Sequence, residues 1–319
     1  MKAIIQSYQP YFILVFFLLG VAVVLPHIWL QTEPITVLST AIQADNVPKW
    51  LLVVVMGILN GLGSWWFNRL FNKKEFQLHS TTLPGLIYAL WMGAISFIYF
   101  DITAPLLGIS LIAGLSSQIE IFRQPRVFSH AFASAFWFGL ASIILFPGAL
   151  FVASIFSALA IARTFNWREY LLVLLGLASP WIWFISLTYL FDSSPINSAI
   201  PAYETPVSVN AMQWTSMIGL TLLSLYGVTK FVYSLSSSTN KARNTKNSAL
   251  IFVAISILTF WVVHFTSPGA ALCLSVIPLA LLAPSTIMST RSGLIQNLLF
   301  YLLLALLALP FIGAFLHQM

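Results

Sequence analysis

The chain has 319 residues, of which 59% are hydrophobic and only 7% are charged, and its mean hydropathy is +0.93. A soluble globular domain carries about 25% charged residues, so this composition excludes a soluble fold and predicts that membrane lipid surrounds the chain. The formal net charge of +6 lies on short segments between apolar runs, which is typical of membrane topology and indicates no nucleic-acid partner. No stretch is polar and long enough for a second domain, so residues 1–319 are expected to form a single integral-membrane domain.

Apolar runs of spanning length recur along the whole chain. A spanning helix needs about 20 mostly apolar residues. The predicted fold class is therefore all-α, a polytopic transmembrane helical bundle of about 11 spans. The eleven candidate spans are 11–30, 50–68, 83–100, 105–122, 131–147, 148–163, 170–191, 213–235, 248–265, 269–288 and 295–315.

The positive charges orient this bundle. When eleven spans alternate in direction, thirteen of the fourteen Lys and Arg residues fall on one side, and only Lys49 falls on the other. Loops rich in Lys and Arg stay in the cytoplasm. We therefore expect a multi-pass protein of the cytoplasmic (inner) membrane, with its N-terminus in the cytoplasm and its C-terminus outside.

Two cytoplasmic loops share the pattern R-x-F-N-x-[KR]-E-[FY]. The Asn and Glu are three residues apart, which is the spacing of a helix N-cap and its N3 partner, so both copies are predicted to start a helix. In the first copy this helix is expected over 73–79, whereas 236–247 is expected to be a flexible connector. The alternative is a pair of basic loops that hold an anionic headgroup or a protein partner. The residues concerned are Arg69, Asn72, Glu75, Arg163, Asn166, Arg168 and Glu169.

Polar residues inside the predicted spans are few. Asn60 lies in mid-span beside Gly57 and Gly61, a small-residue pair that favours helix packing, and its amide is expected to hydrogen-bond a neighbouring helix. The alternative is that Asn60 and the proline-broken helices line a transport path. No carboxylate lies in mid-span, which argues against an ion-coupled pump. The five histidines and single cysteine are scattered, so neither a metal site nor a cofactor is expected.

The first outer loop offers candidate catalytic residues. Glu33 and Asp45 flank a segment predicted to lie as a helix on the outer membrane surface, and His27 and His264 are expected near the same level. A carboxylate at the lipid–water boundary can act as a general base on an acceptor hydroxyl, and the histidines would help bind phosphate. The alternative is that both carboxylates are solvated loop ends.

Two resemblances add to this interpretation. The run 68–88, together with Phe165–Glu169, resembles an uncharacterised bacterial family of polytopic inner-membrane proteins, which implies no activity. The layout also resembles multi-spanning glycosyltransferases that use polyprenyl-phosphate sugars. That resemblance implies a polyprenyl-phosphate-linked substrate and matches Glu33 and Asp45 to an acidic residue in the first outer loop. The adjacent acidic pair and the large outer loop usual in those enzymes are missing here.

These features lead to three hypotheses about function. The first is an inner-membrane protein that handles a lipid-linked or amphiphilic substrate at the outer leaflet, by transferring a sugar from a polyprenyl phosphate. The second is a flippase or uncoupled transporter. The third is a non-catalytic subunit of a larger complex, which docks a protein partner through its cytoplasmic loops.

Overall fold

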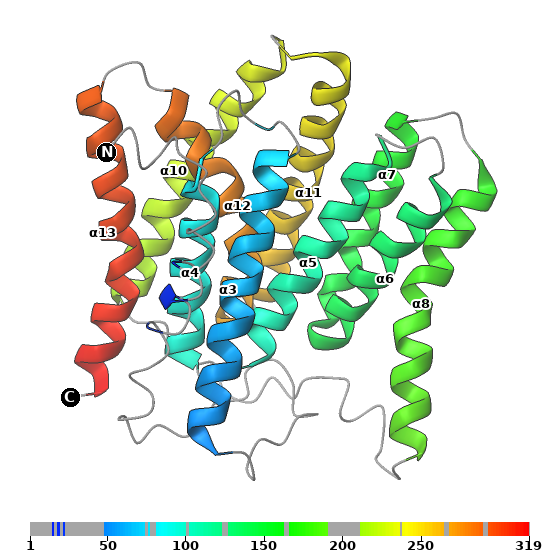
Figure 1. Ribbon diagram of the computed structural model, residues 1–319, viewed down its shortest axis with the longest axis horizontal. Coiled ribbons are helices and arrows are strands. Elements are labelled where there is room, and N and C mark those ends of the chain that lie inside the picture. Colours follow the sequence, from blue (N-terminus) through cyan, green and yellow to red (C-terminus); the bar gives the residue numbers. More distant parts are fainter. Residues whose placement is uncertain are drawn as a thin grey trace.

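In the computed structural model the described residues form helices and short connections (Figure 1). The structure describes residues 48–73, 76, 81–99, 102–122, 127–162, 166–190, 211–236, 238–264, 268–289 and 293–318, and the isolated positions 15, 18, 19 and 22. The helices are α3 (Lys49–Lys73), α4 (Leu83–Tyr99), α5 (Thr103–Glu120), α6 (Phe128–Ile144), the 3-10 helix η2 (Phe146–Phe151), α7 (Val152–Ala162), α8 (Trp167–Leu190), α10 (Ala211–Ser236), α11 (Asn240–His264), α12 (Pro268–Ser289) and α13 (Gly293–Gln318).

These helices confirm the all-α prediction for the described part of the chain. Ten of the eleven predicted apolar segments are helical, and most of the first segment, 11–30, lies outside the described residues. Within the described ranges, four helical segments are long and apolar enough to cross a membrane, which indicates a membrane protein. They are Trp50–Asn72, Trp167–Leu190, Ala242–Val263 and Ala271–Met288.

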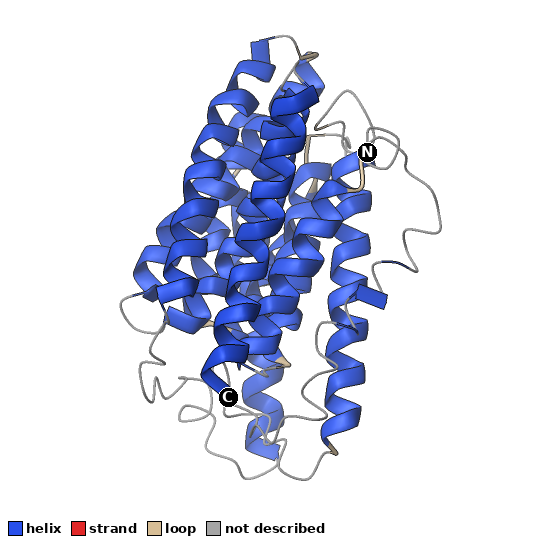
Figure 2. Ribbon diagram, turned by 90° about the vertical axis from the view of Figure 1, so that its left-hand side faces the viewer, coloured by secondary structure: helices blue, strands red, loops and turns tan. Residues whose placement is uncertain are grey.

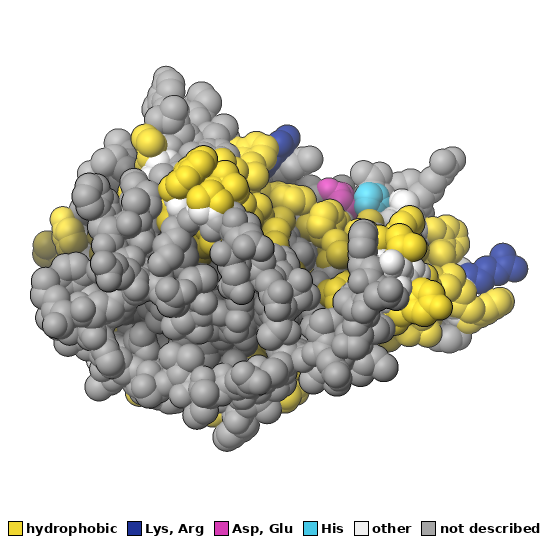
Figure 3. All heavy atoms as spheres, turned by 90° about the horizontal axis from the view of Figure 1, so that it is seen from below, with side chains coloured by type: hydrophobic (Ala, Val, Ile, Leu, Met, Phe, Trp, Pro, Cys, Tyr) yellow, Lys and Arg dark blue, Asp and Glu magenta, His cyan; other side chains and the backbone are white. Residues whose placement is uncertain are grey.

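The helices run along a common direction (Figure 2). They differ sharply in burial. Helix α12 lies among α4, α10 and α11, and 89% of its most apolar segment is buried. Helix α8 lies at the edge of the bundle and packs mainly on α6, so only 17% of its most apolar segment is buried. Seen from below, apolar side chains cover much of the described surface on this α6–α8 side (Figure 3).

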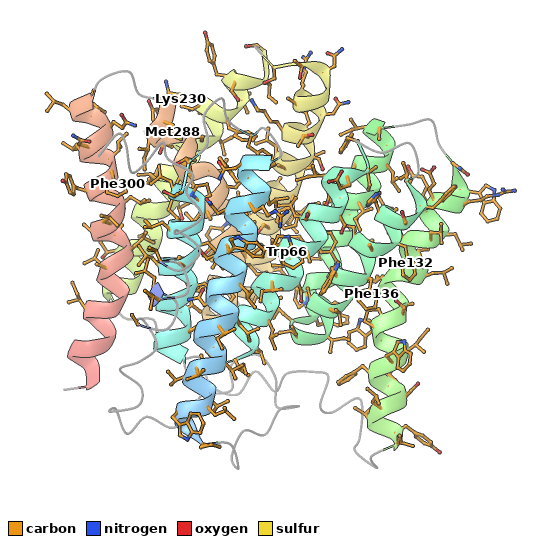
Figure 4. All side chains as sticks on the ribbon, viewed as in Figure 1. Trp66, Phe132, Phe136, Lys230, Met288 and Phe300 are labelled. Carbon is orange, nitrogen blue, oxygen red and sulfur yellow. The ribbon has the colours of Figure 1, made fainter. Side chains whose placement is uncertain are left out.

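The helix ends that carry the described basic residues lie at one end of the bundle, at the top of Figure 1, and Figure 4 shows Lys230 at this end. The last turns of α3 and α10 and the first turns of α8 and α11 all meet that end, whereas α3 starts with Lys49 at the opposite end. The basic residues at the upper end are Arg69, Arg168, Lys230, Arg243 and Lys246.

At two prolines inside described helices, serine hydroxyls replace the lost hydrogen bonds. Proline has no N–H, so Pro278 leaves the carbonyl of Leu274 without its helical donor. The hydroxyl of Ser256, on α11, donates to that carbonyl at 2.8 Å. In α8, Pro180 frees the carbonyl of Gly176 in the same way, and Ser179 donates to it at 2.9 Å. The carbonyls of Leu274 and Gly176 thus find donors within the protein, as a membrane interior requires.

A second polar cluster joins α5, α7 and α11. The buried Gln118 amide donates to the Ser248 hydroxyl at 2.9 Å and to the Ser154 carbonyl at 3.2 Å. Its oxygen accepts from the Ser154 hydroxyl at 2.8 Å. One turn away, the rings of Phe138, Phe151 and Phe252 pack together, with the Phe151 and Phe252 centroids 4.8 Å apart. The polar contacts therefore join α11 to α5 and α7, and the aromatic contacts join it to α6 and η2.

The prediction of a flexible connector over 236–247 is wrong beyond residue 239, because α11 begins at Asn240. Lys246 lies in the second turn of this helix. Its ammonium donates to the hydroxyls of Ser234 at 3.0 Å and Ser238 at 2.8 Å, and approaches the Ser234 carbonyl at 3.5 Å. The charge therefore lies at the C-terminal end of α10, where the helix dipole favours a cation.

Candidate functional site in the α3–α4–α5 core

A row of polar side chains follows one face of α3. Asn60, Ser64, Asn68 and Asn72 are four residues apart, so they lie on a single stripe of the helix. We call these four residues the α3 ladder. The first three are buried and Asn72 is half-buried.

The ladder contacts the backbone of α4. The Asn60 amide donates to the Ala89 carbonyl at 3.3 Å, and the Ser64 hydroxyl donates to the Gly85 carbonyl at 2.6 Å. The Asn68 side-chain oxygen accepts from the Gly85 N–H at 3.4 Å. This N–H belongs to the first turn of α4, where helical donors have no intrahelical partner. The α3 ladder thus fixes the register of α4 and caps its start.

Asn72 holds the chain that leads into α4. Its amide donates to the Thr81 carbonyl, and its oxygen accepts from the Thr81 N–H, both at 2.8 Å. The prediction that Asn72 caps a following helix is therefore wrong, because Asn72 lies in the last turn of α3. Phe76 lies in a bend, and the rest of the predicted 73–79 helix after Lys73, including Glu75, is outside the described residues.

The second copy of the repeat starts a helix, as predicted. The Asn166 side-chain oxygen accepts from the Arg168 N–H at 3.3 Å, and the Asn166 carbonyl accepts from the Glu169 N–H at 3.0 Å. Asn166 is therefore the N-cap of α8. Glu169 is buried in the first turn of that helix, where the dipole favours its negative charge.

The remaining residues of the repeat do not complete a symmetric pair. Arg69 lies over the ring of Trp65, with its guanidinium carbon 5.6 Å from the ring centroid. Arg168 is exposed, and Arg163 is outside the described residues. One copy ends a helix and the other begins one, so the shared sequence pattern has two different local structures.

Three buried polar atoms near the inner part of the α3 ladder have no hydrogen-bond partner among the described residues. They are the Asn60 side-chain oxygen, the Tyr88 hydroxyl and the Ser96 hydroxyl. All three side chains have 0% exposure. An unsatisfied buried polar group costs about 1–3 kcal/mol, so these atoms mark the most unusual polar environment in the described part of the chain.

Tyr88 lies where several helices meet. Its ring stacks on Phe67 with centroids 5.9 Å apart. Its hydroxyl fills the space that side chains would need at Gly63 of α3 and Gly108 of α5, and a Cβ on Gly63 would lie 2.7 Å from that oxygen. Both glycines are thus needed to admit a tyrosine here.

The predicted outer-face site is outside the described residues. Glu33, Asp45 and His27 are not described, and His264 ends α11 with a side chain that is not described either. Their catalytic and phosphate-binding roles stay predictions. Within the described ranges, no group of three or more His, Cys, Asp and Glu residues is arranged to hold a metal ion.

From the sequence, Asn60 and Asn72 were identified as candidates, whereas Ser64, Asn68, Tyr88 and Ser96 were not. Ser64 and Asn68 could have been found, because polar residues repeat every four positions from 60 to 72. Nothing in the sequence indicates the environment of Tyr88, because residues of α3 and α5 form it. Comparison of the chain with protein-family models, curated proteins and solved structures found no match.

Proposed function

We propose that this chain is a multi-pass inner-membrane protein of about 11 spans, with its N-terminus in the cytoplasm and its C-terminus outside. The gathering of Arg69, Arg168, Lys230 and Arg243 at one end of the bundle supports this topology. Under the positive-inside rule that end faces the cytoplasm. Lys49, at the other end of α3, then faces outside.

Within this topology, the chain acts as a flippase or uncoupled transporter that binds the polar part of an amphiphilic or lipid-linked substrate in its interior. The observation that carries this proposal is the group of unpaired atoms on Asn60, Tyr88 and Ser96. Polar groups inside a membrane bundle are costly unless they have a partner. A substrate that supplies hydroxyl or amide groups during its passage gives these atoms one.

The sequence of the three helices fits hydrogen-bonded rather than ionic recognition. The segments 50–68, 83–100 and 103–119 contain no Asp, Glu, Lys or Arg. A substrate in this core would therefore meet amide and hydroxyl groups only. Such contacts bind neutral polar groups without coupling their movement to an ion.

The docking hypothesis has less support from the same residues. Asn72 is bonded to Thr81, Arg69 stacks on Trp65, and Asn166 caps α8. Most described residues of the repeat are thus engaged within the chain and are not presented to a partner. Arg168 is the exposed exception.

The test is mass spectrometry of molecules that co-purify with the full chain in native membrane discs. Asn60→Leu removes the amide at similar volume, and Ser134→Ala is the matched control because it removes a buried hydroxyl that donates to the Gly114 carbonyl in another contact. We expect one amphiphile to be enriched with the wild type, reduced at least tenfold in Asn60→Leu, and retained in Ser134→Ala. Equal retention of bulk lipid by all three proteins would contradict the proposal.

A further inference from the structure

The C-terminal part of the chain carries positive charge without any side chain of opposite sign. All eight Asp and Glu residues lie before residue 205, so residues 205–319 contain none. Helices α10 and α11 nevertheless bring Lys230, Arg243 and Lys246 to the upper end of the bundle in Figure 1. The counter-charge for this end must therefore come from another part of the chain or from another molecule.

Lys246 and Lys230 differ in their surroundings. Lys246 is buried, and its ammonium donates to the hydroxyls of Ser234 and Ser238. Lys230 is half-buried, and its ammonium nitrogen lies 5.4 Å from the centroid of the Tyr226 ring. The face of an aromatic ring attracts a cation and holds it in position. It does not neutralise the charge, so Lys230 is positioned to bind an anion.

The face of α10 that carries Lys230 is open to the outside of the bundle. Leu222, Tyr226, Lys230 and Tyr233 are spaced by four, four and three residues, so they share one stripe of the helix. Leu222, Tyr226 and Tyr233 are exposed. Leu222 lies eight residues from Lys230, about 12 Å along the helix, in the direction of the opposite end. The stripe thus changes from apolar to cationic over a length close to one leaflet of the hydrocarbon core, about 15 Å.

These groups match the parts of an anionic phospholipid. The ammonium of Lys230 can donate to phosphate oxygens, and such charge-assisted hydrogen bonds are strong. Tyrosine rings favour the headgroup level of a bilayer, and the apolar part of the stripe can contact the acyl chains. A free phosphate ion would gain only the contact with Lys230. A lipid gains the apolar contacts as well, so the stripe favours a lipid.

We propose that this stripe of α10 is a binding site for an anionic phospholipid, with Lys230 as the residue that binds its phosphate. The site does not depend on the proposed transport function and shares no residue with the α3–α4–α5 core. In the proposed orientation the lipid belongs to the cytoplasmic leaflet, where anionic lipids attract basic residues near the membrane surface.

The test is native mass spectrometry of the full chain in detergent, titrated with phosphatidylglycerol or with phosphatidylcholine of the same acyl chains. Lys230→Met keeps an apolar stem and removes the charge. We expect this variant to weaken phosphatidylglycerol binding about fivefold and to leave phosphatidylcholine binding unchanged. Unchanged phosphatidylglycerol binding would overturn the proposal.

Arg168→Met is the matched control, because Arg168 is an exposed basic residue at the same end of the bundle and is followed directly by Glu169. We expect it to bind phosphatidylglycerol like the wild type. An equal loss in Arg168→Met and Lys230→Met would indicate a general attraction of anionic lipid to this end and would contradict a specific site. If Lys230→Met fails to fold, Lys230→Gln takes its place and is judged in the same way.

Two further measurements identify the source of the anion and separate this proposal from the transport function. Inorganic phosphate in millimolar excess should not displace phosphatidylglycerol, and displacement would show a site for a soluble anion and overturn the lipid proposal. Asn60→Leu should bind phosphatidylglycerol like the wild type. Failure to find an amphiphile that depends on Asn60 would therefore contradict the transport function alone, whereas unchanged binding in Lys230→Met would contradict the lipid site alone.

Discussion

Helices α12 and α8 are equally apolar and occupy opposite environments. The mean hydropathy of the most apolar segment is 2.0 in α12 and 1.9 in α8. Even so, 89% of the α12 segment is buried and only 17% of the α8 segment. The difference lies in their neighbours. Helix α12 is hydrogen-bonded to α4 through Trp91 and Ser275 and to α11 through Ser256. Helix α8 packs mainly on α6, and its outer face is exposed among the described residues.

This contrast shows that hydropathy predicts whether a helix can cross a membrane. It does not predict whether that helix lies at the centre or at the edge of the bundle. In lipid, apolar surface gives no preference for protein neighbours over acyl chains, so packing and interhelical hydrogen bonds decide the position. Small residues allow close packing, and hydroxyl groups form interhelical hydrogen bonds. The comparison can be tested by changing matched residues on the two helices.

The largest difference is expected for matched leucine truncations. Leu274→Ala in α12 removes a side chain with 0% exposure, and we expect it to lower the free energy of unfolding by about 2–5 kcal/mol. Leu174→Ala in α8 alters a side chain that is 55% exposed, and its effect should stay below about 0.5 kcal/mol. Equilibrium unfolding in mixed micelles of dodecylmaltoside and dodecyl sulfate would measure both. Equal losses of unfolding free energy in the two variants would contradict the difference proposed between the two helices.

The next effect concerns the close approach of α8 to α6. A Cβ on Gly176 would lie 2.7 Å from the Phe132 carbonyl oxygen of α6. We expect Gly176→Ala to cost about 1–3 kcal/mol, because the helices must separate to admit the methyl group. Leu175→Ala, at an exposed neighbouring position, is the control. Unchanged proteolytic protection of α8 in Gly176→Ala would show that this close approach is dispensable.

A smaller effect is expected where serine compensates for proline. Ser256→Ala removes the donor to the Leu274 carbonyl, and hydrogen bonds between membrane helices are worth about 0.6 kcal/mol on average. Pro278→Ala restores an N–H for that carbonyl, so the double variant should lose less than the sum of the single losses. A double-mutant cycle of unfolding free energies measures this coupling. Strict additivity would mean that Ser256 does not serve the proline break.

The smallest effect is expected at the exposed end of α8. Trp183 is 69% exposed and comes after Pro180, the last buried residue of the helix. We expect Trp183→Ala to change the free energy of unfolding by less than about 0.5 kcal/mol in the same assay. A loss above about 1 kcal/mol would indicate that another part of the protein covers this face.

The sequence predicted the helices well because each apolar run is long enough to decide its own secondary structure. The sequence could not predict that α12 is buried and α8 is exposed, since burial depends on contacts made across the bundle. The repeat shows the same limit at residue level. Asn166 caps α8 as predicted, whereas Asn72, in a near-identical pattern, remains in α3 and bonds to Thr81. The backbone groups that lie near each asparagine in space decide its role.

The candidate site was predictable only in part. Asn60 stands out in an apolar run, and the four-residue spacing that links it to Ser64 and Asn68 was present in the sequence. The position of Tyr88 between Gly63 and Gly108 depends on three helices together. The spacing of residues within one helix carries no information on such a junction.

The central place of α12 also constrains the order of assembly. The α3 ladder joins residues at most 29 positions apart, so α3 and α4 can pair soon after both have entered the membrane. The contact between Trp91 and Ser275 spans 184 positions. During synthesis the ribosome must therefore deliver most of the chain before α4 meets its partner in α12. Until then lipid or a chaperone has to cover the surface that becomes the middle of the protein.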